Sequence, residues 1–162
     1  MADAVYRTIV VGYDGTHAAE RALARAAELA RGFGAKIVVV DVAAPIPYDA
    51  PDGAFGLMPY ASYRTPENVV LAEEALWRQH RSSVESYLAQ AGVDSEFAGV
   101  VGQPAGEIVD VAAERKADLI VVGTRDAGFF ERLLGGSVSQ GVAKHARCDV
   151  LVVHVSKPES GD

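Results

Sequence analysis

Short runs of β-branched residues alternate along this chain with alanine-rich stretches, and this alternation limits what the chain can fold into. Five segments have the length and composition of strands: Thr8–Val11, Lys36–Val42, Glu96–Val101, Asp118–Gly123 and Asp149–Val155. Apolar residues on both faces of a strand indicate that helices cover both faces of the sheet. The alternation therefore predicts a doubly wound α/β domain with right-handed crossovers.

Apolar residues at helical spacing predict the helices between these strands. The first helix has Thr16 at its N-cap, and Gly32 and Gly34 are expected to end it. Its apolar face is formed by Ala19, Leu23, Ala26, Ala30 and Phe33. Later helices are predicted near Glu67–Ala91, Ala105–Arg115 and Ser137–His145. Leu76 and Trp77, on the second helix, are expected in the core.

One domain accounts for the whole length. A chain of 162 residues, 49% of them hydrophobic, can build one core without a disulfide or a metal. The single cysteine, Cys148, cannot form an internal disulfide, and we expect it to be buried and unreactive. Residues 1–162 are thus interpreted as one domain.

A 24-residue segment at 43–66 does not fit the minimal alternation, and it holds five of the seven prolines. Loops of this length are usually functional or disordered. The tyrosines in this segment argue against complete disorder, because their rings add apolar surface that can be buried on folding. Two interpretations stay open: an ordered flap over a site or subunit contact, and a mobile insertion.

The net charge of −7 argues against two classes of partner. A generic nucleic-acid-binding protein needs a basic face, and anionic membranes attract basic segments. No apolar run approaches the length of a membrane span, and Met1–Ala4 has neither the basic nor the apolar part of a targeting signal. We therefore expect a soluble, cytoplasmic protein with no nucleic acid and no membrane as partner.

Ligands of open α/β sheets bind outside the carboxyl ends of the strands, where the strand order reverses. Asp14 lies just past the first strand, where its carboxylate could hold a cation or a ribose hydroxyl. Capping of the following helix, or plain solvation, explains the same residue without a ligand. Position alone leaves both interpretations open.

A second candidate segment runs from Gly123, at the end of the fourth strand, to Gly136 and Ser137 at the start of the last helix. A glycine before a helix lets a phosphate approach the N–H groups of the first turn, and the hydroxyls of Ser137 and Ser139 add donors. A Gly-Ser pair is also a common helix start. The segment has no lysine, so it is not a Walker A loop, and the turn after the first strand does not match the dinucleotide motif.

The sequence contains no convincing catalytic set. Its four histidines lack the spacing of metal ligands, and His145 most simply complements the C-terminus of a helix. Neither a Ser-His-Asp order nor a G-x-S-x-G elbow occurs. We therefore expect that the protein is not an enzyme.

Several segments together resemble the universal stress protein family, of the adenine-nucleotide alpha-hydrolase-like superfamily. They span nearly the whole chain: Ile9–Thr16, Gly102-x-Pro104, Ala117–Gly123, Leu133–Ser139 and Cys148–Val153. The resemblance implies a five-stranded parallel sheet of order 3-2-1-4-5, with the first and fourth strands adjacent. It also implies an ATP- or AMP-binding module of stress response or signalling, with Mg²⁺ or Mn²⁺ as a further ligand.

Nucleotide-binding members of that family carry the pattern G-x2-G-x9-G-[ST]. In them the loop and helix start hold ribose and phosphates, the aspartate after the first strand lies near ribose or a metal, and the end of the second strand meets adenine. Carried over to this sequence, the resemblance makes Asp14 the metal ligand as well as a nucleotide contact. The implied nucleotide contacts are Tyr13, Asp14, Val42, Gly123, Arg125, Gly136, Ser137, Val138 and Ser139.

The second glycine of this pattern is replaced by Asp126. A carboxylate about 5 Å from a phosphate costs about 3 kcal/mol at an effective dielectric near 20, or roughly two orders of magnitude in affinity. Gly128 could supply the flexibility instead, Asp126 could turn outward or pair with Arg125, or a divalent cation could bridge it to the phosphates. The alternative function is a nucleotide-free protein-interaction module of the same family.

The last strand also predicts a homodimer. An exposed apolar edge strand needs covering, and residues 150–155 could pair with a second copy of the chain. The resemblance implies the same isologous contact.

Overall fold

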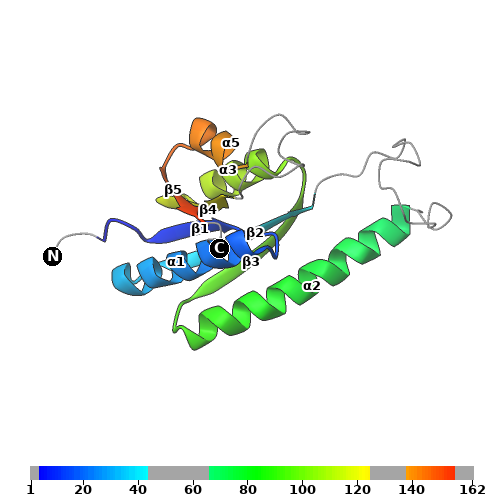
Figure 1. Cartoon of the computed structure of the whole chain (residues 1–162), viewed down its shortest axis with the longest axis horizontal. Helices are drawn as coiled ribbons and strands as arrows, with labels where there is room; N and C mark the ends of the chain where they lie inside the picture. The colour runs from blue at the N-terminus through cyan, green and yellow to red at the C-terminus, as the bar shows by residue number, and fades with distance from the viewer. Residues whose placement is uncertain (1–3, 44–65, 125–137, 156–162) are drawn as a thin grey trace, which may run out of the picture.

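The computed structural model describes residues 4–43, 66–124 and 138–155. Within them, five parallel strands form one sheet in the order β3-β2-β1-β4-β5 (Figure 1). The strands are β1 Thr8–Gly12, β2 Lys36–Ala43, β3 Ser95–Val101, β4 Leu119–Thr124 and β5 Asp149–His154. The helices are α1 His17–Phe33, α2 Pro66–Gln90, α3 Pro104–Glu114 and α5 Val138–His145. The predicted fold class and strand order are confirmed.

Helices cover both faces of the sheet, as the continuous apolar strands require (Figure 1). Val11 and Val39 point into the core beneath α1 and α2. Val10 and Val38, their neighbours along the chain, point into a second core beneath α3 and α5. Successive strand residues alternate between the faces, so each apolar run fills two cores at once.

The central strand β1 marks the point where the strand order reverses. Val11 pairs with Val39 of β2 on one side and with Val121 of β4 on the other. The chain builds outward from β1 to β2 and β3, then returns to place β4 on the opposite side of β1. The carboxyl ends of β1 and β4 are therefore the switch point at which ligands of such sheets bind.

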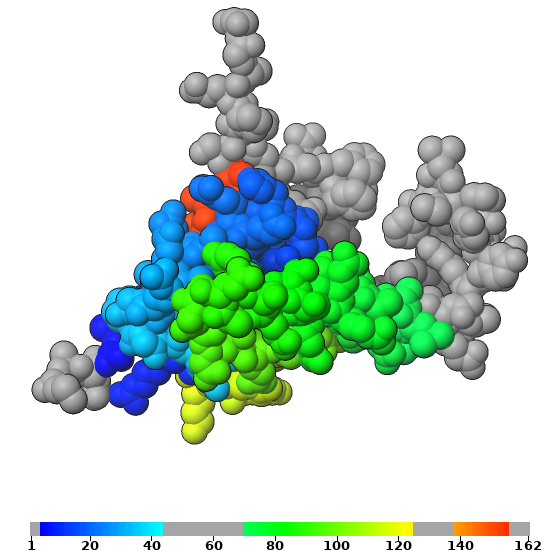
Figure 2. All heavy atoms as spheres, turned by 90° about the horizontal axis from the view of Figure 1, so that it is seen from below, coloured from blue at the N-terminus to red at the C-terminus, as the bar shows by residue number. Residues whose placement is uncertain are grey.

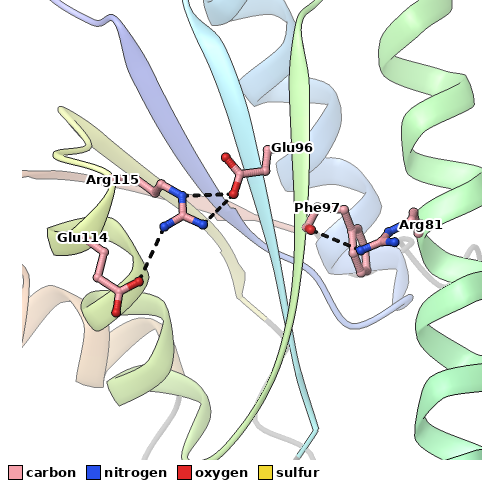
Figure 3. Close-up of polar contacts among 5 residues, drawn as sticks. All are labelled: Arg81, Glu96, Phe97, Glu114 and Arg115. Atoms are coloured by element: carbon pink, nitrogen blue, oxygen red, sulfur yellow. Dashed lines mark hydrogen bonds and ion pairs between the residues drawn. The ribbon is translucent and has the colours of Figure 1, made fainter.

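Strand β3, at one edge of the sheet, is tied to both helix layers (Figure 3). Arg115, at the end of α3, donates to Oε1 of Glu96 from Nε at 3.0 Å and from Nη2 at 2.6 Å. This hydrogen bond is the main reason that the pKa of Glu96 is lowered. On the opposite face, Arg81 of α2 lies over the ring of Phe97, 5.3 Å from its centroid.

Three predictions about side chains and caps were wrong. Gly32 lies inside α1, and Gly34 alone is the C-cap, with φ of 68° and its N–H bonded to the carbonyl of Ala30. Leu76 is 50% exposed, because the amino-terminal part of α2 extends past the sheet (Figure 1). Cys148 is half-buried rather than buried. Trp77, by contrast, packs against the core beneath α1 and α2 as expected.

Figure 2 shows α1 and α2 on the same side of the molecule, and both helices contribute to one core, with Ala22 from α1 and Leu88 from α2. None of the helices in the described ranges has the length and apolar character needed to cross a membrane. The segment predicted as an insertion meets β2 at Ala43 and α2 at Pro66, and residues 44–65 lie outside the described ranges.

Candidate functional site

The candidate site lies at the carboxyl edge, where β1 and β4 end next to each other. A four-residue loop, Tyr13–Thr16, leads from β1 into α1, and α5 follows β4 in the chain. The structure thus brings Tyr13, Asp14 and Gly123 to one edge of the sheet, as predicted. The predicted residues outside the described ranges are Arg125, Asp126, Gly128, Gly136 and Ser137.

Asp14 folds back on its own loop. Its Oδ1 accepts hydrogen bonds from the backbone N–H of Thr16 at 3.0 Å and from the hydroxyl of Thr16 at 2.5 Å. That hydroxyl accepts in turn from the N–H of Ala19 at 3.3 Å, which confirms Thr16 as the N-cap of α1. The turn fixes an exposed carboxylate at the start of a helix, where the helix dipole favours negative charge. Both interpretations of Asp14 stay open, because an exposed carboxylate at this position can support the helix start and can also meet a ligand.

Gly123 is required by the packing of α1. A Cβ atom added to Gly123 would lie 2.4 Å from the carbonyl oxygen of Ala18. Since this oxygen belongs to the backbone, the helix itself would have to move to relieve the clash. The glycine therefore lets the first turn of α1 lie against the end of β4. This role holds with or without a ligand, so the role of Gly123 in phosphate binding stays a prediction.

Tyr13 and Val42 flank the end of β2. The N–H of Tyr13 donates to the carbonyl of Val40 at 2.9 Å, which holds the start of the loop against β2. Burial, and then the charges of Glu20, Asp41 and Asp14, raise the pKa of the Tyr13 hydroxyl. Val42 is half-buried against the core beneath α3 and α5, which leaves part of it open at this edge.

Helix α5 begins with Val138 and Ser139 in its first described turn. Val138 is exposed, whereas Ser139 is buried. The two neighbours therefore present different groups: an accessible side chain at Val138 and an enclosed hydroxyl at Ser139. Their predicted contacts with phosphate stay predictions.

The described residues do not form a metal site on their own. They include no group of three or more His, Cys, Asp or Glu side chains that could hold a metal ion. Magnesium is often bound through one or two carboxylates together with phosphates and water. The single exposed carboxylate of Asp14 is compatible with that pattern, and its role as a metal ligand stays a prediction.

Sequence reasoning missed a buried pair beside this loop. Nδ1 of His80, on α2, lies 2.5 Å from Oδ2 of Asp41, on β2, and the two side chains are 14% and 6% exposed. Burial raises the pKa of the Asp41 carboxyl, while hydrogen bonds from His80 and Trp77 act in the opposite direction. The sequence does contain a signal for this pair, because Asp41 lies inside the apolar strand Lys36–Ala43 and a buried carboxylate needs a hydrogen-bonding partner.

Comparison with protein families matches residues 5–154 to the model of the universal stress protein family. A universal stress protein of Mycobacterium tuberculosis is 33% identical over 154 residues, which cover 93% of this chain and 98% of that protein. Another, from Methanocaldococcus jannaschii, is 34% identical over 157 residues, covering 96% of this chain and 86% of that protein.

Solved structures agree with these sequence matches. A universal stress protein in complex with cAMP is 33% identical, with a TM-score of 0.64, and the match covers 93% of this chain and 98% of that one. The universal stress protein of Archaeoglobus fulgidus in complex with dAMP is 28% identical, with a TM-score of 0.59, covering 92% of this chain and 98% of that one. Both relatives thus carry an adenine nucleotide.

Proposed function

This chain belongs to the universal stress protein family, and from that premise we propose that it is an adenine-nucleotide-binding module of stress response or signalling. Its ligand is ATP or AMP, it hydrolyses ATP slowly or not at all, and it acts as a homodimer. The observation that carries the proposal is the arrangement at the switch point. There the loop Tyr13–Thr16 and the end of β4 adjoin, in a family whose relatives are solved with cAMP and dAMP.

The site offers distinct groups to the parts of a nucleotide. Val42 is assigned to the adenine, and Asp14, beside the backbone of Tyr13, offers a carboxylate that can accept hydrogen bonds from ribose hydroxyls. The start of α5 supplies backbone N–H groups for phosphate. Mg²⁺ or Mn²⁺ would bridge Asp14 and the phosphates of ATP, which reduces their mutual repulsion.

Binding without rapid turnover is supported by how His80 is placed. An Asp-oriented histidine can act as a general base when its second nitrogen reaches the reacting water. Here the ring packs against the backbone of Gly15, and the side chain is 14% exposed. The pair is therefore placed to support a loop rather than to activate water.

Dimerisation is supported by β5. In the described sheet β5 pairs only with β4, so its other edge carries unpaired backbone groups. Val150, Leu151 and Val152 on this strand are half-buried, which leaves apolar surface for a second copy. Sedimentation of the wild-type chain, compared with a Val152→Lys variant, tests this part: the proposal expects a dimer that the lysine dissociates.

Calorimetric titration of the purified chain with AMP, and with ATP in the presence and absence of Mg²⁺, tests nucleotide binding. Asp14→Ala should weaken binding by about 1–3 kcal/mol, because it removes a charged acceptor. Arg25→Ala, on the exposed side of α1, is the matched control and should bind like the wild type. Absence of heat at millimolar nucleotide, with no rise in melting temperature, would refute the proposal.

A nucleotide-free interaction module is the second candidate, and Asp126 in the place of a motif glycine favours it. Asp126→Gly distinguishes the two functions, because it removes the carboxylate and restores the glycine of the family pattern. If the wild type binds no nucleotide and Asp126→Gly does, the second function is the correct one.

A further inference from the structure

The buried pair of Asp41 and His80 lies directly beneath the loop that carries Asp14. Asp41, backbone included, is 4% exposed, in a strand whose other residues facing this core are apolar. An ionised carboxylate in such a place is costly unless it is paired and hydrogen-bonded. His80 supplies the partner from α2, with its Nδ1 2.5 Å from Oδ2 of Asp41. Trp77 also acts to lower the pKa of the Asp41 carboxyl, against the effect of burial.

The other side of the His80 ring faces the loop. A Cβ atom on Gly15 would lie 2.6 Å from Nε2 of His80, so the ring rests against the backbone of Gly15, which has φ of 74°. The ring of Tyr13 meets the ring of His80 edge to face, with centroids 5.4 Å apart and an interplanar angle of 89°. Asp14 lies between these two supported residues.

The loop is therefore fixed on each side of Asp14. The N–H of Tyr13 is bonded to Val40 of β2, and the side chain of Asp14 is bonded to Thr16 at the start of α1. Between these anchors, the His80 ring packs against both Tyr13 and Gly15 and so limits how closely the loop can approach the core. A shorter side chain at position 80 would leave a void under the backbone that orients Asp14.

We propose that His80, oriented by Asp41, is a positioning residue that places Asp14 against the ribose of a bound adenine nucleotide. This inference rests on the proposed function, because the loop that His80 supports belongs to the proposed nucleotide site. Helix α2 thereby takes part in nucleotide recognition without touching the ligand.

His80→Asn is the variant that tests this role. Asparagine keeps an N–H donor near the position of Nδ1, so Asp41 retains a partner, but it removes the ring beneath Gly15. Gln79→Ala, at an exposed neighbouring position on α2, is the matched control. Affinities for AMP and for 2′-deoxy-AMP are measured by calorimetry for each variant, together with the melting temperature.

A positioning role predicts a selective loss. His80→Asn should weaken AMP binding about tenfold, which is about 1.4 kcal/mol, and leave 2′-deoxy-AMP, which lacks one ribose hydroxyl, nearly unaffected. In an Asp14→Ala background the same substitution should no longer change AMP affinity, since its effect passes through Asp14. Equal losses for both nucleotides, no loss for either, or the full loss in the Asp14→Ala background would overturn the inference.

A second measurement keeps the test valid if His80→Asn does not fold. In the wild-type chain, AMP should shift the amide signal of Gly15 and the imidazole signals of His80 over the same concentration range. It should also change the fluorescence of Trp77, the single tryptophan. Unmoved His80 signals in a chain that binds AMP refute the inference alone, whereas a chain that binds no nucleotide refutes the proposed function and the inference with it.

Discussion

The contact between Gly123 and α1 allows a sharp prediction about stability. Gly123→Ala adds one carbon atom at a point 2.4 Å from the carbonyl oxygen of Ala18 and 2.7 Å from its carbonyl carbon. Both atoms belong to backbone, in the first turn of a helix whose start is fixed by the Thr16 cap. The added methyl can be accommodated only if α1 and the end of β4 move apart.

The size of the effect follows from two opposing terms. Overpacking a close contact costs about 1–3 kcal/mol. Replacement of glycine by alanine recovers about 0.5–1 kcal/mol, because the unfolded chain loses conformational freedom. We therefore expect a net destabilisation of about 1–2 kcal/mol, which lowers the melting temperature by about 2–4 °C for each kcal/mol in a chain of this size.

Urea unfolding followed by circular dichroism measures this change. Gly32→Ala is the matched control, because Gly32 lies inside α1 and a Cβ there meets nothing within 4 Å. That variant should gain up to about 1 kcal/mol from helix propensity. If Gly123→Ala proves as stable as the wild type while Gly32→Ala behaves as expected, the contact does not require glycine and the reasoning fails.

Two further predictions concern titrating groups. Arg115 lowers the pKa of Glu96 below its ordinary value of 4.5. The stabilisation from this ion pair is therefore present above pH 4.5 and is lost as the pH falls through the folded-state pKa. Glu96→Gln should reduce the urea midpoint at neutral pH but not in acid, and an equal reduction at both pH values would contradict this prediction. Burial, followed by the charges of Asp149 and Asp118, raises the pKa of the Cys148 thiol. Because the thiolate is the reacting form, a thiol reagent should label the folded chain more slowly than the urea-unfolded chain at mildly alkaline pH. Equal labelling rates would refute this prediction.

The fold could be predicted because its signals are local. Strand runs such as Ile37–Val40 are apolar on both faces, and each is followed by a helix-length segment, so the pattern alone indicates a sheet between two layers. The N-cap at Thr16 was also evident, since a hydroxyl residue before a helical repeat has one common explanation. The order of the strands came from the family resemblance, because alternation does not determine it.

The site was less predictable because its contacts join distant parts of the chain. Asp41 and His80 are 39 positions apart, and spacing gives no indication that α2 brings them together. Gly123 was assigned to phosphate on its place in a motif, whereas its packing partner Ala18 is visible only in three dimensions. Leu76 was misplaced for a similar reason, since helical periodicity does not reveal where a long helix runs past its sheet.

At the amino edge of the sheet, opposite the candidate site, Asp118 accepts the backbone N–H groups of Arg7 at 2.8 Å and Thr8 at 3.0 Å. The Asp118 N–H returns a bond to the carbonyl of Thr8 at 2.9 Å. These three hydrogen bonds fix the register of β1 against β4 at the amino ends of the two strands. Connections at the carboxyl end can therefore be exchanged or lengthened without a slip in pairing, and one scaffold can carry different recognition loops.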